Sequence, residues 1–159
     1  MFTKAVLPSL LSVVLFPLAC DVTGPPAGFP YASASLACGP VSGLGTLIIL
    51  ARDPIASAGP TFPFVQIALS APVSALAGRT FPIDRSRSIS WASYLPGPPG
   101  GEDAFAGRVS VERVDSDRTV HGEVSLWFPS RRVVGTFTAQ WIPWTGGSIV
   151  CPAGALYAQ

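Results

Sequence analysis

From Cys38 onward, short apolar runs alternate with polar segments rich in glycine, proline, serine and aspartate. No stretch has the period of an amphipathic helix, whereas short runs between turn-forming residues are typical of strands. The pattern predicts an all-β domain, an antiparallel β-sandwich or small barrel of about seven or eight strands. The predicted strands are Leu44–Arg52, Phe64–Ser70, Thr80–Asp84, Ser88–Tyr94, Arg108–Val114, Thr119–Phe128 and Val133–Trp141, with a further one near Ser148–Cys151.

The last three of these strands are predicted to form a C-terminal meander, because Asp115–Arg118 and Pro129–Ser130 supply good turn residues between them. Strict alternation then gives one apolar face and one mostly polar face. The apolar face carries Val109, Val111, Val120, Val124, Leu126, Val133, Phe137, Ala139 and Trp141. Gly122 and Gly135 share this face, where their missing side chains would make room for the Phe137 ring. The polar face carries Ser110, Glu112, His121, Glu123, Ser125, Trp127, Arg132, Val134, Thr136 and Thr138.

The N-terminal residues read as export and attachment segments rather than as part of the domain. Lys4 gives a positive start, an apolar run follows over residues 5–16, and small Ala19 precedes Cys20. This run is too short to cross a bilayer core of roughly 30 Å as a helix, so residues 1–19 are predicted to be a signal peptide. The Gly/Pro/Ser-rich residues 20–36 predict a semi-extended tether. Residues 37–159 then form a single β domain.

The residues Leu18-Ala19-Cys20 resemble the lipobox of bacterial lipoproteins, in which small or aliphatic residues precede an invariant cysteine; Pro17 stands where a leucine is usual. The resemblance implies that Cys20 becomes the mature N-terminus and carries a diacylglyceryl thioether and acyl chains such as palmitate. Two or three acyl chains on one residue anchor a protein stably. The expected location is therefore the bacterial cell envelope, on either the inner or the outer membrane.

A second, weaker resemblance concerns the C-terminal strands. The order Val120-x-Gly-x-Val-x-Leu-x-Phe128, followed by Gly135-Thr-Phe137, looks like the last strands of many small bacterial lipoproteins. It covers about thirty residues of hydrophobic pattern plus glycine. Those proteins have no catalytic residues to carry over, so this resemblance bears on the fold class alone.

Three cysteines are an odd number for an exported protein. Lipid on Cys20 would leave Cys38 and Cys151, near the two ends of the domain, free to form a disulfide in an oxidising compartment. Two alternatives remain at this point, namely metal ligation and two buried free thiols. Metal ligation has little support from two cysteines and a single histidine.

The charge balance excludes one class of partner. After removal of the segment that holds the only lysine, Lys4, the chain has nine arginines and nine acidic residues. No basic stripe remains to hold phosphates, so a nucleic acid is not expected as a partner. Only 12% of the residues are charged, and a sparsely charged, neutral surface favours association with another protein, a glycan or a membrane. The alternative explanation is the codon bias of a G+C-rich genome, since the chain is rich in alanine, glycine, proline and arginine and has no asparagine.

The sequence offers little machinery for catalysis. His121 is the only histidine, and the chain lacks a nucleophile elbow, a zinc-protease helix, a phosphate-binding loop and a dinucleotide fingerprint. We therefore expect no catalytic residues, no metal and no cofactor. The alternative is a hydrolase that uses His121 with carboxylates as acid and base.

Four aromatic and arginine residues form the candidate binding surface, because such residues are favoured at binding hot spots. They are Trp127, Arg132, Trp144 and Tyr94. Trp127 should point away from the core beside Arg132, within reach of a cation–π contact; alternatively, a second sheet covers this face and Trp127 belongs to the core. The predicted function is a membrane-anchored envelope lipoprotein with a non-catalytic binding or structural role, for example as an accessory subunit of a membrane complex. A carrier that holds a small apolar ligand inside the barrel is a further alternative.

Overall fold

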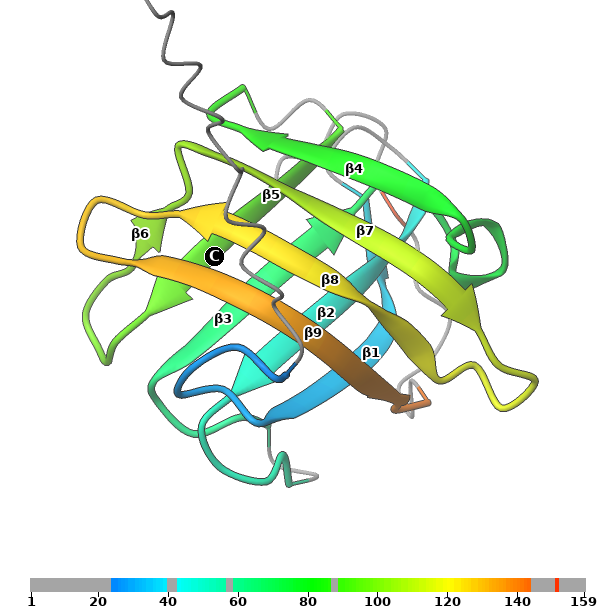
Figure 1. Cartoon of the computed structure of the whole chain (residues 1–159), viewed down its shortest axis with the longest axis horizontal. Coiled ribbons are helices and arrows are strands. Elements are labelled where there is room, and N and C mark those ends of the chain that lie inside the picture. The colour runs from blue at the N-terminus through cyan, green and yellow to red at the C-terminus, as the bar shows by residue number, and fades with distance from the viewer. Residues whose placement is uncertain (1–23, 40–42, 57–58, 87–88, 144–150, 152–159) are drawn as a thin grey trace, which may run out of the picture.

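The protein is described by a computed structural model over residues 24–39, 43–56, 59–86, 89–143 and 151. Strands make up the described elements apart from one short 3-10 turn, η1 (Val73–Ala75). The all-β class predicted from the sequence is confirmed (Figure 1). The strands are β1 (Tyr31–Cys38), β2 (Leu44–Ala51), β3 (Phe64–Leu69), β4 (Arg79–Asp84), β5 (Ser90–Leu95), β6 (Glu102–Asp103), β7 (Ala106–Val114), β8 (Val120–Trp127) and β9 (Arg132–Trp141).

These nine strands form one sheet in the order β4-β7-β8-β9-β1-β2-β3-β5-β6, which curls into a half-barrel. Neighbouring strands are antiparallel except β1 and β9, which pair in parallel over two positions. The curl produces two layers, with β4, β7, β8 and β9 facing β1, β2, β3 and β5 (Figure 1). It also brings β5 close to β4, where the Ser90 hydroxyl donates a hydrogen bond to the Pro82 carbonyl oxygen.

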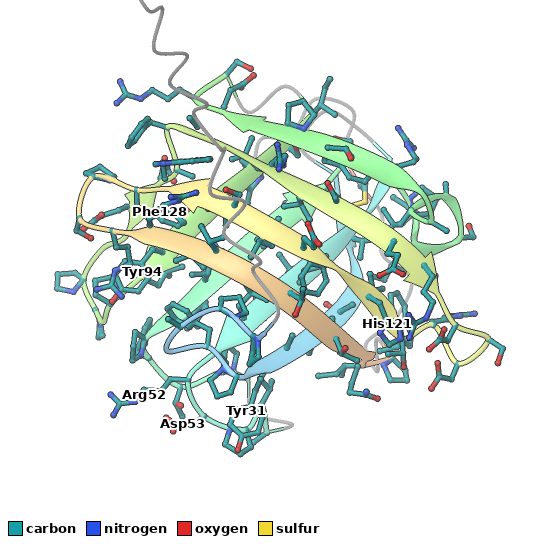
Figure 2. All side chains as sticks on the ribbon, in the orientation of Figure 1. Tyr31, Arg52, Asp53, Tyr94, His121 and Phe128 are labelled. Carbon is teal, nitrogen blue, oxygen red and sulfur yellow. A yellow bond between two sulfur atoms is a disulfide. The ribbon has the colours of Figure 1, made fainter. Side chains whose placement is uncertain are left out.

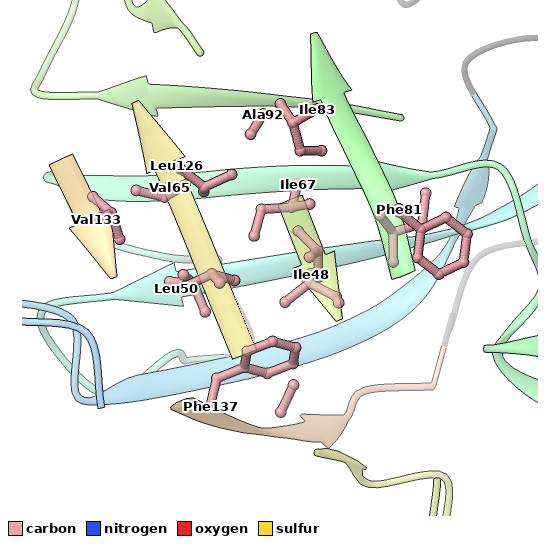
Figure 3. Packing of buried hydrophobic residues seen from close by; sticks show 14 of the residues in the cluster. Ile48, Leu50, Val65, Ile67, Phe81, Ile83, Ala92, Leu126, Val133 and Phe137 are labelled. Atoms are coloured by element: carbon pink, nitrogen blue, oxygen red, sulfur yellow. The ribbon is translucent and has the colours of Figure 1, made fainter. Parts of the chain in front are cut away.

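The core lies between the two layers, whose strands cross at a steep angle (Figure 3). Ile48, Leu50, Val65 and Ile67 point into it from one layer, and Phe81 points into it from the other; all five are at most 1% exposed. Because alternate side chains of a strand point to opposite faces, each strand contributes every second residue to this space. Burying one such side chain stabilises the fold by roughly 1.5–3 kcal/mol.

The C-terminal meander has the predicted strands, order and faces. All eight smaller members of the predicted apolar face are buried, and Trp141 packs half-buried against the same core. One irregularity was not predicted: a bulge shifts the register of β7 between Val111 and Arg113, so that Arg113 lies opposite His121 on β8. The extra residue moves the Arg113 side chain to the polar face of the sheet.

The predicted tether was too long at its C-terminal end. β1 begins at Tyr31, so residues 31–36, which the sequence pattern placed in the tether, form part of the sheet. The strand was missed because its residues are mostly alanine and serine, which give no apolar run. The preceding segment is also packed on the domain: the Thr136 amide donates to the Gly24 carbonyl oxygen (2.7 Å), and Phe29 is buried edge-on against Tyr94.

The two glycines of the apolar face have different roles. A Cβ on Gly122 would lie 2.9 Å from Cζ of Phe137, so this glycine does make room for the Phe137 ring as predicted. A Cβ on Gly135 would instead lie 2.5 Å from the Pro26 nitrogen and 2.7 Å from the Gly24 oxygen. The prediction for Gly135 was therefore wrong, because the space there is taken by the N-terminal segment that docks on β9.

Cys38, at the end of β1, forms a disulfide with Cys151, and the two Cα atoms lie 5.3 Å apart. The predicted pairing is confirmed, which removes the metal-ligand and free-thiol alternatives for these two residues. The bridge closes a loop of 113 residues, which would restrict the unfolded chain by about 5 kcal/mol on the loop-entropy model. The strand predicted near Ser148–Cys151 falls, apart from Cys151, outside the described residues.

The close approach at Gly122 gives a test of this packing. Gly122→Ala should lower the free energy of unfolding by about 1–3 kcal/mol, because the added methyl group must displace the Phe137 ring and the Ser110 carbonyl. Gly97→Ala is the matched control, since a Cβ there has nothing within 4 Å and should change stability by less than ~0.5 kcal/mol. Urea unfolding of the two variants measures the difference. Equal stabilities would contradict the packing described.

Candidate functional site

The outer face of β7, β8 and β9 carries a cluster of polar side chains around His121. The turn between β7 and β8 is closed by two backbone hydrogen bonds, from the Asp115 amide to the Thr119 oxygen and from the Arg118 amide to the Asp115 oxygen, both 2.9 Å. Arg118 has φ +68 in this turn. The turn brings the Asp115 side chain beside the imidazole of His121.

Three side chains surround the imidazole ring. Nε2 of His121 lies 2.6 Å from Oδ2 of Asp115, and Nδ1 lies 3.2 Å from Oγ1 of Thr138. Arg113 Nη2 lies 3.2 Å from each of the two ring nitrogens, and Arg113 Nε donates to Asp115 Oδ1 at 3.2 Å. In neutral His121, an Nε2–H that donates to the carboxylate leaves Nδ1 as the acceptor for Thr138 or Arg113. The result is a continuous hydroxyl–imidazole–carboxylate chain.

The two aspartates of the turn are both held in their charged form. The hydrogen bond from His121 is the main cause that lowers the pKa of Asp115; partial desolvation opposes it, and the hydrogen bond from Arg113 assists it. The pKa of Asp117 is lowered chiefly by the backbone amide of Thr119, which donates to Asp117 Oδ1 at 3.0 Å. Asp117 therefore shapes the turn, while Asp115 orients the histidine.

The His121 side chain, 16% exposed, lines a surface groove of about 380 Å³, which we call the histidine groove. One part of its lining is polar and comes from the outer face of the meander, and the other is apolar and comes largely from the N-terminal segment. The polar lining is Glu112, Arg113, His121, Glu123, Thr136 and Thr138, and the remaining lining is Pro25, Phe29, Pro30, Ala32, Gly122 and Phe137. A groove of this composition can hydrogen-bond a ligand and also pack against an apolar part of it.

No family model, curated protein or solved structure matches this chain. Among the described residues, no three histidine, cysteine or acidic side chains are grouped so that they could hold a metal ion. None of the described segments is a helix long and apolar enough to cross a bilayer.

The members of the predicted binding surface lie in different places. Trp127 is half-buried on the outer face of β8, and Cζ of Arg132 lies 4.9 Å above its ring centre, so the predicted contact is present and Trp127 is not a core residue. Tyr94 was misplaced: it is 5% exposed and faces inward from β5. Its ring packs against Phe29 and Phe128, with Arg131 over it at 3.8 Å (Figure 2). Trp144 and Cys20 lie outside the described residues.

The sequence placed His121 on the polar face but did not identify its partners. Thr138 lies directly opposite His121 on β9, as the predicted register implies. Arg113 reaches His121 only because of the β7 bulge, which has no sequence signature here. Asp115 was interpreted as a turn residue; the one available signal was its position six residues before the only histidine, across a tight turn.

The Asp115–His121 contact predicts a pH-dependent contribution to stability. Because the pKa of Asp115 is lower in the folded protein than in the unfolded chain, its contribution is present above the ordinary aspartate pKa and is lost as the pH falls through the lowered folded value. Asp115→Asn should therefore be less stable than the wild type at neutral pH, and the gap should close as the pH falls below about 4. Urea midpoints over a pH series measure this gap. Glu112→Gln, which removes an exposed carboxylate from the preceding strand β7, is the control for the loss of one negative charge. An Asp115→Asn gap that does not vary with pH would rule out the assignment.

Proposed function

We propose that the protein is an envelope lipoprotein, anchored through lipid on Cys20, whose β domain binds a partner without catalysing a reaction. The observation that carries this proposal is the Cys38–Cys151 disulfide. Disulfides form and persist in oxidising compartments such as the bacterial periplasm, which agrees with an exported chain. The disulfide also accounts for two of the three cysteines and leaves Cys20, at the lipobox-like position, available for lipid.

The binding role is supported by the outer face of the meander. The histidine groove combines carboxylates and hydroxyls with proline and phenylalanine surface, and the Trp127–Arg132 pair lies on the same face of β8 and β9. Tryptophan and arginine are enriched among the residues that contribute most to binding. The chemistry suits an extended peptide or a glycan, both of which present hydrogen-bonding groups beside apolar surface. A subunit of a membrane complex that presents such a segment would be a suitable partner.

The three cysteines should separate anchoring from folding. Cys20→Ser should remove the lipid and release the protein from the membrane fraction while its unfolding free energy stays unchanged. Cys38→Ser should leave the protein in the membrane fraction but destabilise the domain by about 5 kcal/mol, the loop-entropy value for a bridge of this span. Mass spectrometry of the N-terminal peptide, membrane fractionation and urea unfolding measure the three quantities. If the two substitutions had the same effect, this division of roles would be wrong.

A hydrolase is the second candidate, and the Thr138–His121–Asp115 chain favours it. The spacing resembles that of a hydroxyl nucleophile, a base and an orienting carboxylate. However, Arg113 also lies within hydrogen-bonding distance of Nδ1 and competes with Thr138 for its lone pair. Thr138 is on a regular strand rather than on a strained turn that would project a nucleophile.

The proposal predicts that purified protein shows no turnover of ester or amide model substrates that depends on His121. His121→Ala is the test, because it removes the only histidine of the chain, and Glu112→Gln is the control within the same groove. Turnover that is lost in both His121→Ala and Asp115→Asn, and kept in Glu112→Gln, would establish the hydrolase instead. The third alternative, an apolar-ligand carrier, gains no support, because side chains such as Ile48, Leu50 and Phe81 fill the space between the layers.

A further inference from the structure

We propose that the end of the domain that bears Tyr31 and Phe62 rests directly on the lipid bilayer. This inference depends on the anchor on Cys20 proposed above, and it adds a second contact between the protein and the membrane, made by the folded domain itself. Three observations support it: a pair of exposed aromatic side chains, the shortness of the chain between Cys20 and the domain, and the balance of charge around the aromatic pair.

The aromatic side chains lie in one row on the outer face of the layer formed by β1, β2 and β3. Tyr31 pairs with Ala51 on β2, which in turn pairs with Phe64 on β3. The Phe62 ring stacks on the Phe64 ring, with a centroid distance of 5.2 Å. Tyr31 is 44% exposed and Phe62 is 45% exposed. We call the two exposed side chains, Tyr31 and Phe62, the aromatic rim.

The rim has firm support from the domain beneath it. Ile49, Ala51 and Phe64 form a small buried cluster on this face, separate from the main core, and Ile55 and Leu95 pack against it. Tyr31 and Phe62 therefore project from a packed apolar base. Aromatic side chains are favoured at the interface between lipid and water, where a ring lies among the headgroups, and Tyr31 can keep its hydroxyl group hydrated there.

The chain between the anchor and the domain is very short. Gly24 is already fixed to β9 through the Thr136 amide, and only four peptide units separate it from Cys20. Four residues span at most about 14 Å when fully extended. Cys20 must therefore lie within that distance of Gly24, so a lipid on Cys20 would keep the domain close to the membrane surface.

The rim is on the same side of the molecule as the segment that leads into β1. In Figure 1 this blue segment, the start of β1 and the β2–β3 connection lie in the lower part of the domain, and Figure 2 shows Tyr31, Arg52 and Asp53 together there. The exposed Phe105 differs in both position and surroundings, because it follows β6, its amide bonds to Trp127, and the Arg85 guanidinium covers its ring at 5.7 Å. The rim is thus the aromatic surface that the short tether brings to the bilayer.

The charges beside the rim indicate what kind of lipid it needs. Arg52 and Asp53 follow Ala51 directly and are both exposed, and Asp53 Oδ2 accepts a hydrogen bond from the Thr61 hydroxyl at 3.1 Å. Since one positive and one negative charge lie side by side, attraction to anionic headgroups contributes little. Docking should therefore occur on neutral phosphatidylcholine and should be insensitive to salt.

Hydroxyl-radical footprinting of the full, lipidated chain in phosphatidylcholine vesicles tests the proposal. The oxidation rates of Tyr31 and Phe62, each divided by that of Phe105 in the same sample, should be about tenfold lower in vesicles than in the Cys20→Ser chain recovered from the soluble fraction. Phe105, which is 41% exposed, is the matched internal control. Lipidated protein whose Tyr31 and Phe62 react as fast in vesicles as in solution would overturn the docking while the anchor stands. Protein without lipid would overturn both proposals.

A double variant, Tyr31→Ser with Phe62→Ser, separates the rim from the anchor. The lipidated variant should remain in the vesicles. Ile55, which is half-buried beside the rim, should then be oxidised as fast in vesicles as in the soluble Cys20→Ser chain with the same two substitutions, because the rim no longer holds the domain against the lipid. Phe105→Ser, the control, should leave Tyr31 and Phe62 protected. The rim could instead be protected in the soluble Cys20→Ser chain, to a degree that rises with protein concentration. That result would show that a second copy of the chain, rather than lipid, covers the rim, and it would overturn the proposal.

Discussion

The packing of apolar side chains between the two layers of one curled sheet is the interaction on which the rest of the structure depends. Every strand that takes part must send alternate residues into the same narrow space, so the opposite residues are sent outward by necessity. Fully buried side chains such as Ile48, Ile67 and Phe81 fix the register of their strands in this way. The histidine groove and the aromatic rim are both on outer faces, where this constraint leaves residues free for other tasks.

The outer faces of the two layers differ in character. On the meander, the outward positions carry acids, arginines and hydroxyls around His121. On β2 and β3, the outward positions Leu47, Ile49 and Phe64 are apolar and form their own small cluster. A half-barrel with one polar and one apolar outer face can contact two unlike surroundings at once, which agrees with the binding role and the membrane contact proposed above.

Much of the fold could be predicted from the sequence because apolar and polar residues alternate along a half-buried strand. This alternation is clear in the sequences of β7, β8 and β9. β1 was missed because its residues are mostly alanine and serine, so the two faces of the strand differ little in hydrophobicity. Tyr94 was assigned to the surface because it lies next to a proline-glycine loop. It is two residues from Ala92 on β5, however, so both side chains point to the same, inward face. The partners of His121 depend on a bulge and on the fold-back of a turn, which are local backbone choices that a hydrophobic pattern does not record.

The hydrogen bond between the Thr136 amide and the Gly24 carbonyl has a mechanical consequence. It joins the start of the described chain to the edge of β9, and β9 is joined by its ladder to β8 and by a short parallel pairing to β1. A force applied to the chain ahead of Gly24 would therefore act directly on β9, which lies between β8 and β1 in the nine-stranded sheet. The Cys38–Cys151 bridge holds the far end of β1 by a covalent bond. If the chain is anchored through Cys20 as proposed, the domain would follow movement of that anchor as a rigid body, together with any ligand in the histidine groove.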